Sequence, residues 1–186
     1  MIHTKKERNQ FWEWSKALFI AFGLAWLTRY FIFTPIVVDG ESMMPTLENG
    51  DYLIVNKIGY QLGEPNRYDI VVFHAPENKD YIKRVIGLPG DHVAYKNDQL
   101  YINGIPQAEP YLDTYKNEIN EGTLTEDFTL EEKTKWAVIP EGFVFVMGDN
   151  RRFSKDSRII GLISMEEIIG NTHIIFWPPN EIGLAD

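Results

Sequence analysis

Residues 81–91 read Tyr-Ile-Lys-Arg-Val-Ile-Gly-Leu-Pro-Gly-Asp, and they give the clearest indication of the fold. Six residues rich in β-branched and aromatic side chains are followed at once by a turn with proline and glycine in suitable places. Because side chains alternate along a strand, we expect Tyr81, Lys83 and Val85 on one face and the intervening residues on the other. The stretch therefore predicts a β-strand that holds a lysine among apolar neighbours.

Short segments of the same kind recur after Pro35, each bounded by turn residues. Asn97-Asp98 and Asn103-Gly104 are typical of tight hairpin turns. Ser164-Met165-Glu166-Glu167 resembles a capping box and predicts one short helix, Met165–Ile169. Because strands dominate and few helices separate them, we expect a mainly β fold with antiparallel sheets. The other predicted strands are 36–38, 52–56, 70–74, 92–95, 100–103, 137–139, 143–147 and 172–177.

The amino-terminal part of the chain has a different character. Residues 1–16 carry a basic cluster, and residues 17–33 form an apolar run whose only charge is Arg29. A run of this length is at the short end of what spans a bilayer. Its exit, Thr34–Val38, is too bulky for a signal-peptide cleavage site, and the run lacks the polar face of an interfacial helix. We therefore predict a single transmembrane anchor in the lipid bilayer over 17–33.

Two further boundaries follow from this anchor. The basic cluster places residues 1–16 in the cytoplasm, so residues 34–186 form one extracytoplasmic domain. Within that domain, residues 107–135 form a polar stretch with eight acids and one base between 107 and 132. We expect this acidic stretch to be a solvated excursion from the core.

The composition argues against several classes of function. The 186 residues include no cysteine, so a disulfide framework, a thiolate metal site and a cysteine nucleophile are excluded. The four histidines are scattered without metal-ligand spacing, and we predict neither a metal nor another cofactor. The net charge of -9 argues against binding of nucleic acid.

A serine follows the apolar run, in residues 38–47, which read Val-Asp-Gly-Glu-Ser-Met-Met-Pro-Thr-Leu. The hydroxyl of this residue, Ser42, is a weak nucleophile unless a base lies within hydrogen-bond reach. Gly40 permits backbone conformations that other residues resist, and a turn here would present the hydroxyl beside a free backbone N–H. Taken alone, an ordinary loop serine is the simpler interpretation.

Lys83 is the only plausible base for Ser42 in the sequence. It must be neutral to act, which costs about 4 kcal/mol at neutral pH when the pKa is near 10.4. Burial of the lysine removes most of that cost. A third segment, residues 148–158, concentrates hydroxyls, carboxylates and guanidiniums that can orient a neutral lysine, with Asp156 and Arg158 as an ion pair.

Taken together, these segments closely resemble the bacterial type I signal peptidases, which are membrane-bound Ser/Lys proteases of the secretory pathway. The resemblance covers nearly the whole chain, and the short anchor and compact middle resemble the single-span Gram-positive forms. The matching segments, in order, are the anchor, the Gly-x-Ser-Met-x-Pro-Thr-Leu box, residues 50–57, residues 68–73, residues 81–91 and the Gly-Asp-Asn-Arg box at 148–151.

The resemblance implies a serine endopeptidase of the bacterial cell membrane. It would remove amino-terminal signal peptides from secretory preproteins by cleaving after small residues, in an Ala-x-Ala-like pattern. Ser42 would be the nucleophile and Lys83 the general base. Ser154 would orient the lysine, and Asp156 and Arg158 would support the site.

The resemblance also identifies two departures and a set of pocket residues. Gly40 stands where some members have a hydroxyl residue that supplies a second oxyanion donor, so that donor must come from elsewhere. Arg152-Phe153 stands where an acidic or polar pair is common. The residues implied to wall shallow pockets for small side chains are Ile36, Val38, Leu47, Tyr81 and Ile82.

Two other interpretations are weaker but stay open. Self-cleaving repressors share the Ser/Lys pair and a related β core, but they are soluble and carry a DNA-binding domain. A catalytically silent, membrane-tethered paralogue would bind preproteins without cleaving them. Such a protein would have lost the serine or the lysine, and both are present here.

Overall fold

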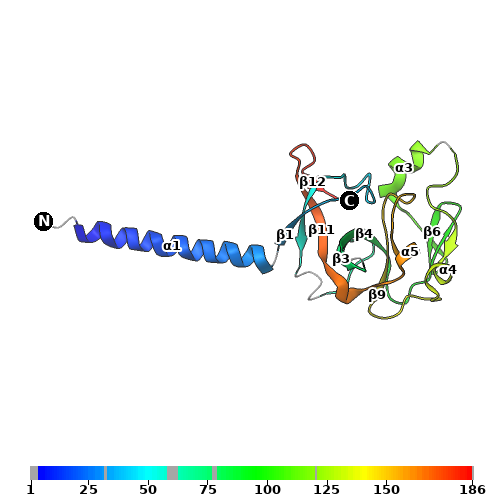
Figure 1. The fold of residues 1–186 in the computed structure, drawn as a ribbon, viewed down its shortest axis with the longest axis horizontal. Coiled ribbons are helices and arrows are strands. Elements are labelled where there is room, and N and C mark those ends of the chain that lie inside the picture. Colours follow the sequence, from blue (N-terminus) through cyan, green and yellow to red (C-terminus); the bar gives the residue numbers. More distant parts are fainter. Residues whose placement is uncertain (1–3, 32, 58–62, 77–78, 120, 186) are drawn as a thin grey trace.

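A long helix, α1 (Thr4–Phe31), stands out from a β-rich domain, and β1 (Phe33–Val37) leads into that domain (Figure 1). The predicted membrane span over 17–33 is not supported, because no helix among the described residues is both long and apolar enough to cross a bilayer. The helix begins well before the apolar run and takes in the charged Glu13 and Lys16. This computed structural model describes residues 4–31, 33–57, 63–76, 79–119 and 121–185.

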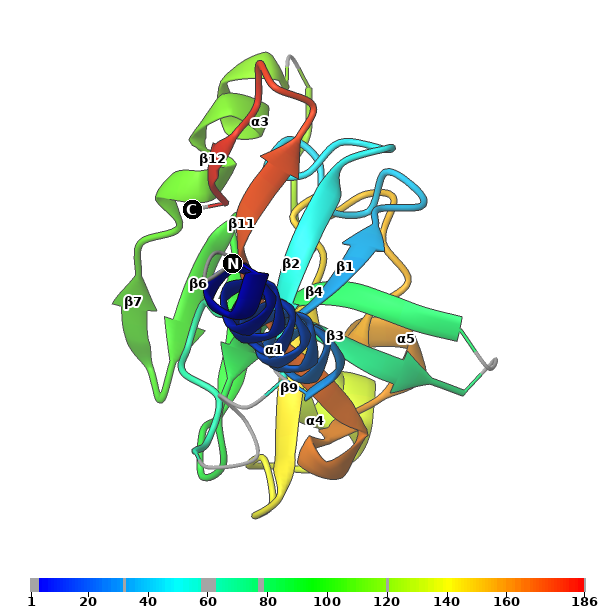
Figure 2. The same cartoon turned by 90° about the vertical axis from the view of Figure 1, so that its left-hand side faces the viewer.

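The larger sheet contains eight of the strands found in the described chain, and every pairing in it is antiparallel. Its order is β1-β2-β11-β3-β4-β9-β10, with β12 paired to β11. Figure 2 shows β1, β2 and β11 next to one another in this sheet. The predicted antiparallel β fold is therefore confirmed. The strands after β1 are β2 (Tyr52–Asn56), β3 (Ile70–Ala75), β4 (Lys79–Gly87), β9 (Phe143–Met147), β10 (Ile163–Ser164), β11 (Ile168–Trp177) and β12 (Gly183–Leu184).

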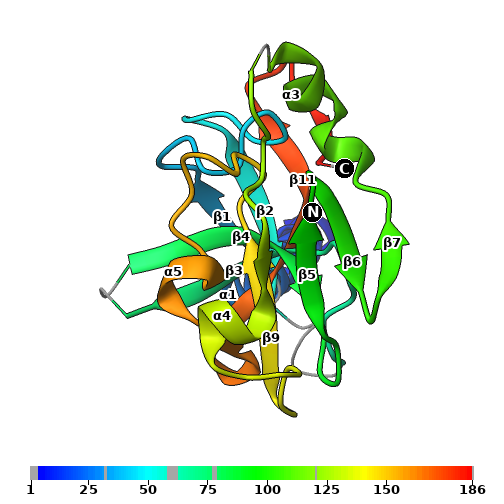
Figure 3. The same cartoon turned by 90° about the vertical axis from the view of Figure 1, so that its right-hand side faces the viewer.

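The smaller sheet contains four of the described strands in the order β7-β6-β5-β8, again antiparallel. Figure 3 shows β5, β6 and β7 side by side. The two hairpins of this sheet turn at Asn97-Asp98 and Asn103-Gly104, as predicted. All four of these residues have positive φ, which the tightest hairpin turns require. The strands are β5 (Val93–Lys96), β6 (Gln99–Ile102), β7 (Ile105–Gln107) and β8 (Phe128–Thr129).

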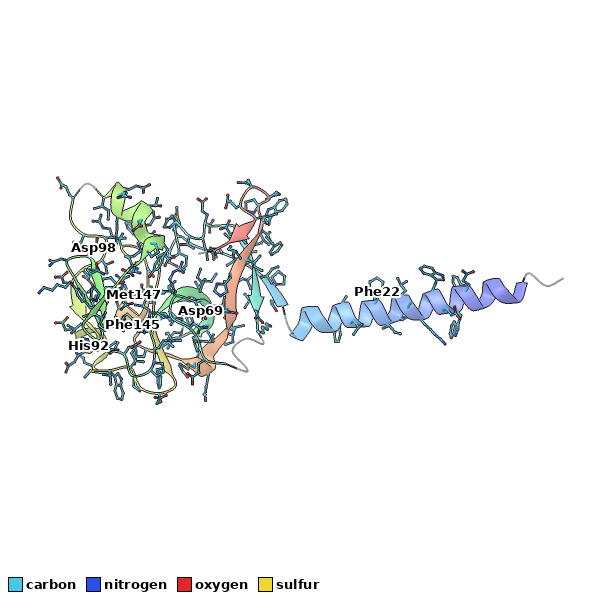
Figure 4. All side chains as sticks on the ribbon, turned by 180° about the vertical axis from the view of Figure 1, so that it is seen from behind. Phe22, Asp69, His92, Asp98, Phe145 and Met147 are labelled. Atoms are coloured by element: carbon cyan, nitrogen blue, oxygen red, sulfur yellow. The ribbon has the colours of Figure 1, made fainter. Side chains whose placement is uncertain are left out.

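Strand β9 is buried on both faces and joins the two parts of the core. Phe145 and Met147 pack with side chains of the smaller sheet, and both lie in the interior of the domain (Figure 4). Val144 and Val146 pack on the other side, against β3 and β4. Burial of a large apolar side chain contributes about 1.5–3 kcal/mol, so β9 is a firm base for the loop that follows it.

Short helical segments fill the connections, and two local predictions are wrong. The helix predicted over 165–169 is a 3-10 turn, η2 (Met165–Glu167), because Ile168 already pairs with Phe73 of β3. No strand forms over the described residues 137–139, since Ile139 bonds instead to the turn at Gly90 and Asp91. The other segments are η1 (Pro110–Leu112), α3 (Asp113–Glu118), α4 (Leu130–Thr134) and α5 (Ser157–Ile160).

The acidic stretch contributes to the core as well as to the surface. Leu112, Leu124, Phe128 and Leu130 are buried, and β8 pairs with β5 of the smaller sheet. Most of its carboxylates remain exposed, but that of Glu109 is buried. The stretch is thus attached to the domain by apolar side chains that alternate with its charges.

Candidate active site

Ser42 lies on a turn that follows β1. Gly40 has φ +111°, in the left-handed region that favours glycine, and its N–H donates to Asn49 Oδ1 at 2.9 Å. The backbone N–H of Asn150 donates to the carbonyl of Ser42 at 3.1 Å, and its side-chain amide donates to the carbonyl of Glu41 at 3.0 Å. The loop after β9 therefore holds the serine turn in place.

Lys83 reaches Ser42 from the middle of β4. Its Nζ lies 2.7 Å from Ser42 Oγ and 2.8 Å from the carbonyl oxygen of Ile82. Only 3% of Lys83 is exposed, and its Nζ lies 5.2 Å from the centre of the Tyr81 ring on the same strand face. The structure thus brings the serine together with a lysine whose side chain is almost fully shielded from water.

This burial changes the protonation of Lys83. Loss of hydration lowers its pKa from 10.5 to about 8, and the negative charges of Asp156 and Asp149 oppose the change. At pH 7.4 about one fifth of a group with that pKa is neutral, against about one in a thousand for an exposed lysine. Lys83 can therefore act as a base near neutral pH.

Arg84 points to the opposite face of β4. It forms a buried ion pair with Asp149, with Nη2–Oδ2 at 2.8 Å and Nε–Oδ1 at 3.0 Å. Thr46 Oγ1 donates to the same carboxylate at 2.6 Å, so the pair connects β4 with the serine turn. Sequence reasoning did not single out this pair, although Arg84 stands beside Lys83 in its box.

In the segment after β9, Asp156 and Arg158 form an ion pair, but the hydroxyl of Ser154 is not hydrogen-bonded to Lys83. Arg158 and Asp156 form the predicted ion pair at 2.8 Å, and the Gly148 N–H donates to Asp156 at 3.0 Å. Ser154 is 8% exposed, and its Oγ has no hydrogen-bond partner among the described residues. The structure therefore lacks the bond from Ser154 to Lys83 that the resemblance implies.

Gly148 accounts for the close approach of Ser154 to the serine turn. A Cβ built at position 148 would lie 2.3 Å from Ser154 Oγ and 2.3 Å from the carbonyl oxygen of Ser42. Real Cβ atoms do not approach other atoms so closely, so only glycine fits. The glycine belongs to the Gly-Asp-Asn-Arg box, but sequence reasoning gave it no separate role.

A second buried ion pair joins the acidic stretch to this loop. Arg151 Nη2 lies 2.7 Å from Glu109 Oε1, and both side chains are almost fully buried. The hydroxyls of Tyr95 and Tyr111 donate to the same carboxylate oxygen at 2.5 and 2.9 Å. Sequence reasoning counted Glu109 among the solvated acids and missed this role. No cluster of metal-ligating side chains occurs among the residues that the structure describes.

A cleft of about 440 Å³ opens beside Ser42 and Lys83. Four of the five residues predicted to wall substrate pockets line it: Ile36, Val38, Tyr81 and Ile82. The fifth, Leu47, is fully buried in the core and does not line the cleft. Phe153, which is 77% exposed, and Lys155 also line the cleft, and sequence reasoning had assigned neither of them to it.

Comparison with known proteins identifies the family. The family model for signal peptidase, peptidase S26, matches residues 11–177. The chain belongs to this signal peptidase family. The resemblance seen in the sequence and the assignment as a peptidase are therefore confirmed.

Individual family members match over most of the chain. Signal peptidase I of Bacillus caldolyticus is 49% identical over 178 residues, which cover 96% of each chain. Signal peptidase IB of Staphylococcus aureus (strain N315) is 44% identical over 94% of this chain and 93% of the relative. The crystal structure of a signal peptidase I from Enterococcus faecalis V583 matches with a TM-score of 0.56 and 43% identity, over 59% of this chain and 97% of that chain.

Proposed function

We propose that this enzyme removes amino-terminal signal peptides from secreted preproteins by acyl transfer through Ser42 and Lys83. The observation that carries the proposal is the 2.7 Å separation between Ser42 Oγ and a buried lysine whose pKa is lowered to about 8. A nucleophile within hydrogen-bond reach of its base is the arrangement that covalent catalysis needs. The relatives named signal peptidase I and IB support the same substrate class.

The reaction proceeds in two halves. Neutral Lys83 takes the proton of Ser42, and Oγ forms a bond to the carbonyl carbon of the substrate. The backbone N–H of Ser42 serves as one donor to the resulting oxyanion. The Lys83 ammonium then protonates the leaving amine as the C–N bond breaks. In the second half, Lys83 takes a proton from water, the hydroxide displaces Ser42 from the acyl group, and the proton returns to Oγ.

The substrate backbone adds as a strand beside residues 36–39. The β1 strand lies at one end of the larger sheet, so its outer edge is open to such pairing among the described strands. Ile36, Val38, Tyr81 and Ile82 line the cleft next to that edge. Apolar walls this close to Ser42 leave shallow pockets, which select small side chains before the scissile bond.

Helix α1 and the nearest strands associate with the lipid bilayer. Large apolar side chains along α1 are exposed, and Phe22 points away from the rest of the chain (Figure 4). Val37, Tyr52 and Trp177 are aligned across β1, β2 and β11, and all three are exposed. Association with a membrane raises the effective concentration of substrates held there. The single-pass topology with a cytoplasmic amino terminus stays a prediction.

The proposed reaction is tested by incubating the purified protein with one preprotein and sequencing the new amino terminus of the product. We expect cleavage after a small residue, and no cleavage by Ser42→Ala or Lys83→Ala. Lys79→Ala is the matched control, because Lys79 is an exposed lysine on the same strand as Lys83 and does not line the cleft. Substantial processing by Lys83→Ala would exclude the lysine as the base.

A further inference from the structure

A second hollow, of about 690 Å³, adjoins the cleft on the other side of the serine turn. Glu41 and Phe153 line both spaces. From them the second hollow passes Met44 and Asn150 and extends to α3, Ile119 and Glu121. Because Asn150 is hydrogen-bonded to the serine turn, the hollow begins directly beside the turn that carries Ser42.

Carboxylates gather around this hollow. Glu41, Glu118 and Glu121 line it, and all three are exposed at its surface. Tyr115 also lines the hollow, and its pKa is raised, first by burial and then by the negative charges of Glu118, Glu41 and Glu48. Charges from the serine turn and from α3 therefore act at the same place.

The cationic side chains that line the hollow, among the described residues, do not cancel these charges. Arg152 is the one cation in the described lining, and its guanidinium donates to the carbonyls of Glu121 and Thr123. Lys116, the only base between residues 107 and 132, does not line the hollow and instead donates to the carbonyl of Asp98. Three carboxylates against one guanidinium leave the hollow negative.

We propose that this hollow receives the first residues of the mature chain, those after the scissile bond, and favours basic side chains among them. The proposal rests on the proposed function, in which residues before the bond occupy the cleft beside Ile36 and Val38. A substrate that crosses Ser42 must continue on the far side, where the hollow begins. Phe153, between the two spaces, contacts the chain near the scissile bond.

The same assignment gives a role to two sequence features that catalysis leaves unexplained. The acidic stretch supplies α3 and the carboxylates that line the hollow. The departure of the final box, Arg152-Phe153, supplies two further lining residues. Both features would therefore set the preference for the mature region and leave the chemistry at Ser42 unchanged.

The test uses three preproteins that differ only at the second to fourth residues after the scissile bond, which are all lysine, all glutamine or all glutamate. We expect kcat/KM to be about 3- to 10-fold higher for the lysine substrate than for the glutamate substrate, because exposed charge pairs have modest effects. The ratio of kcat/KM between the lysine and glutamate substrates should fall toward one at high salt, because salt screens exposed charges. The preference for the lysine substrate should disappear in the double variant Glu118→Gln/Glu121→Gln. It should persist in the control Glu131→Gln/Glu141→Gln, because Glu131 and Glu141 line neither the cleft nor the hollow.

Each other outcome is decisive. Equal cleavage of the three substrates by the unaltered enzyme would overturn this inference and leave the proposed function standing. So would a preference that survives Glu118→Gln/Glu121→Gln, or one that the control variant also loses. Failure of the unaltered enzyme to cleave even the glutamine substrate would instead refute the proposed function, and this inference with it.

Discussion

Lys83 is expected to destabilise the fold in which it acts. Its pKa is about 8 in the folded protein and 10.5 without burial, and a difference of about 2.5 units corresponds to about 3 kcal/mol. Lys83→Met keeps a long unbranched side chain but carries no charge. The variant also loses the hydrogen bond between Lys83 and Ser42, and this loss lowers the gain in stability by about 1 kcal/mol. We therefore expect Lys83→Met to raise the free energy of unfolding at pH 7 by about 2 kcal/mol.

The difference in the free energy of unfolding between Lys83→Met and the unaltered enzyme should decrease as the pH rises. Below about pH 8 the folded protein holds a buried ammonium, and the full cost of burying it is present. Between about pH 8 and 10.5 the unfolded state binds more protons, so the stability of the unaltered enzyme rises relative to the variant. Above pH 10.5 the lysine is neutral in both states. Only the lost bond to Ser42 then remains, and the variant becomes the less stable protein.

The assay is urea unfolding of the full chain in detergent at several pH values from 7 to 11, with tryptophan fluorescence as the readout. Lys79→Met is the control, because Lys79 is an exposed lysine at the start of the same strand. Effects of pH on other groups cancel in the difference between two proteins. A stability difference that stays constant across this range, or a Lys83→Met variant less stable at pH 7, would refute the reasoning.

Two further predictions concern activity. Because Lys83 must be neutral, kcat/KM should rise about tenfold per pH unit in acid and level off above pH 8; a plateau already reached at pH 6 would contradict a lysine base. Because the Ser154 hydroxyl has no partner among the described residues, Ser154→Ala should change kcat less than about 3-fold at pH 8. A loss of about 100-fold would show that this hydroxyl turns to Lys83 during the reaction.

The fold could be predicted from sequence where the pattern is local. The predicted strands 52–56 and 143–147 match β2 and β9 at both ends, because continuous apolar runs bounded by turns define them. Residues 137–139 have a similar composition, but Ile139 gives its backbone groups to a turn at 2.8 and 2.9 Å. Composition does not reveal which distant segment supplies the partner. The helix predicted at 165–169 is cut short for the same reason.

The same distinction between local pattern and distant packing applies to the residues of the candidate site. Ser42, Lys83, Asp156 and Arg158 stand in motifs whose order and spacing were readable from the sequence. The structure joins Ser42 to Lys83 and Asp156 to Arg158. The ion pair of Glu109 was not readable, because its partner lies 42 residues away and Glu109 stands among acids that are mostly exposed. Burial decides its role, and burial depends on packing between distant segments.

Two adjacent basic residues on β4, Lys83 and Arg84, lie in different environments on opposite faces of the strand. The pKa of Lys83 is lowered by burial on one face, and Arg84 forms a buried ion pair with Asp149 on the other. The pairing of Lys83 with Val71 and of Arg84 with Ile70 sets which residue faces which side. A shift of one residue would exchange them, placing a permanent cation beside Ser42. A single residue inserted between Ile82 and Lys83 would move Lys83 to the other face and thus abolish catalysis, although every catalytic side chain were retained.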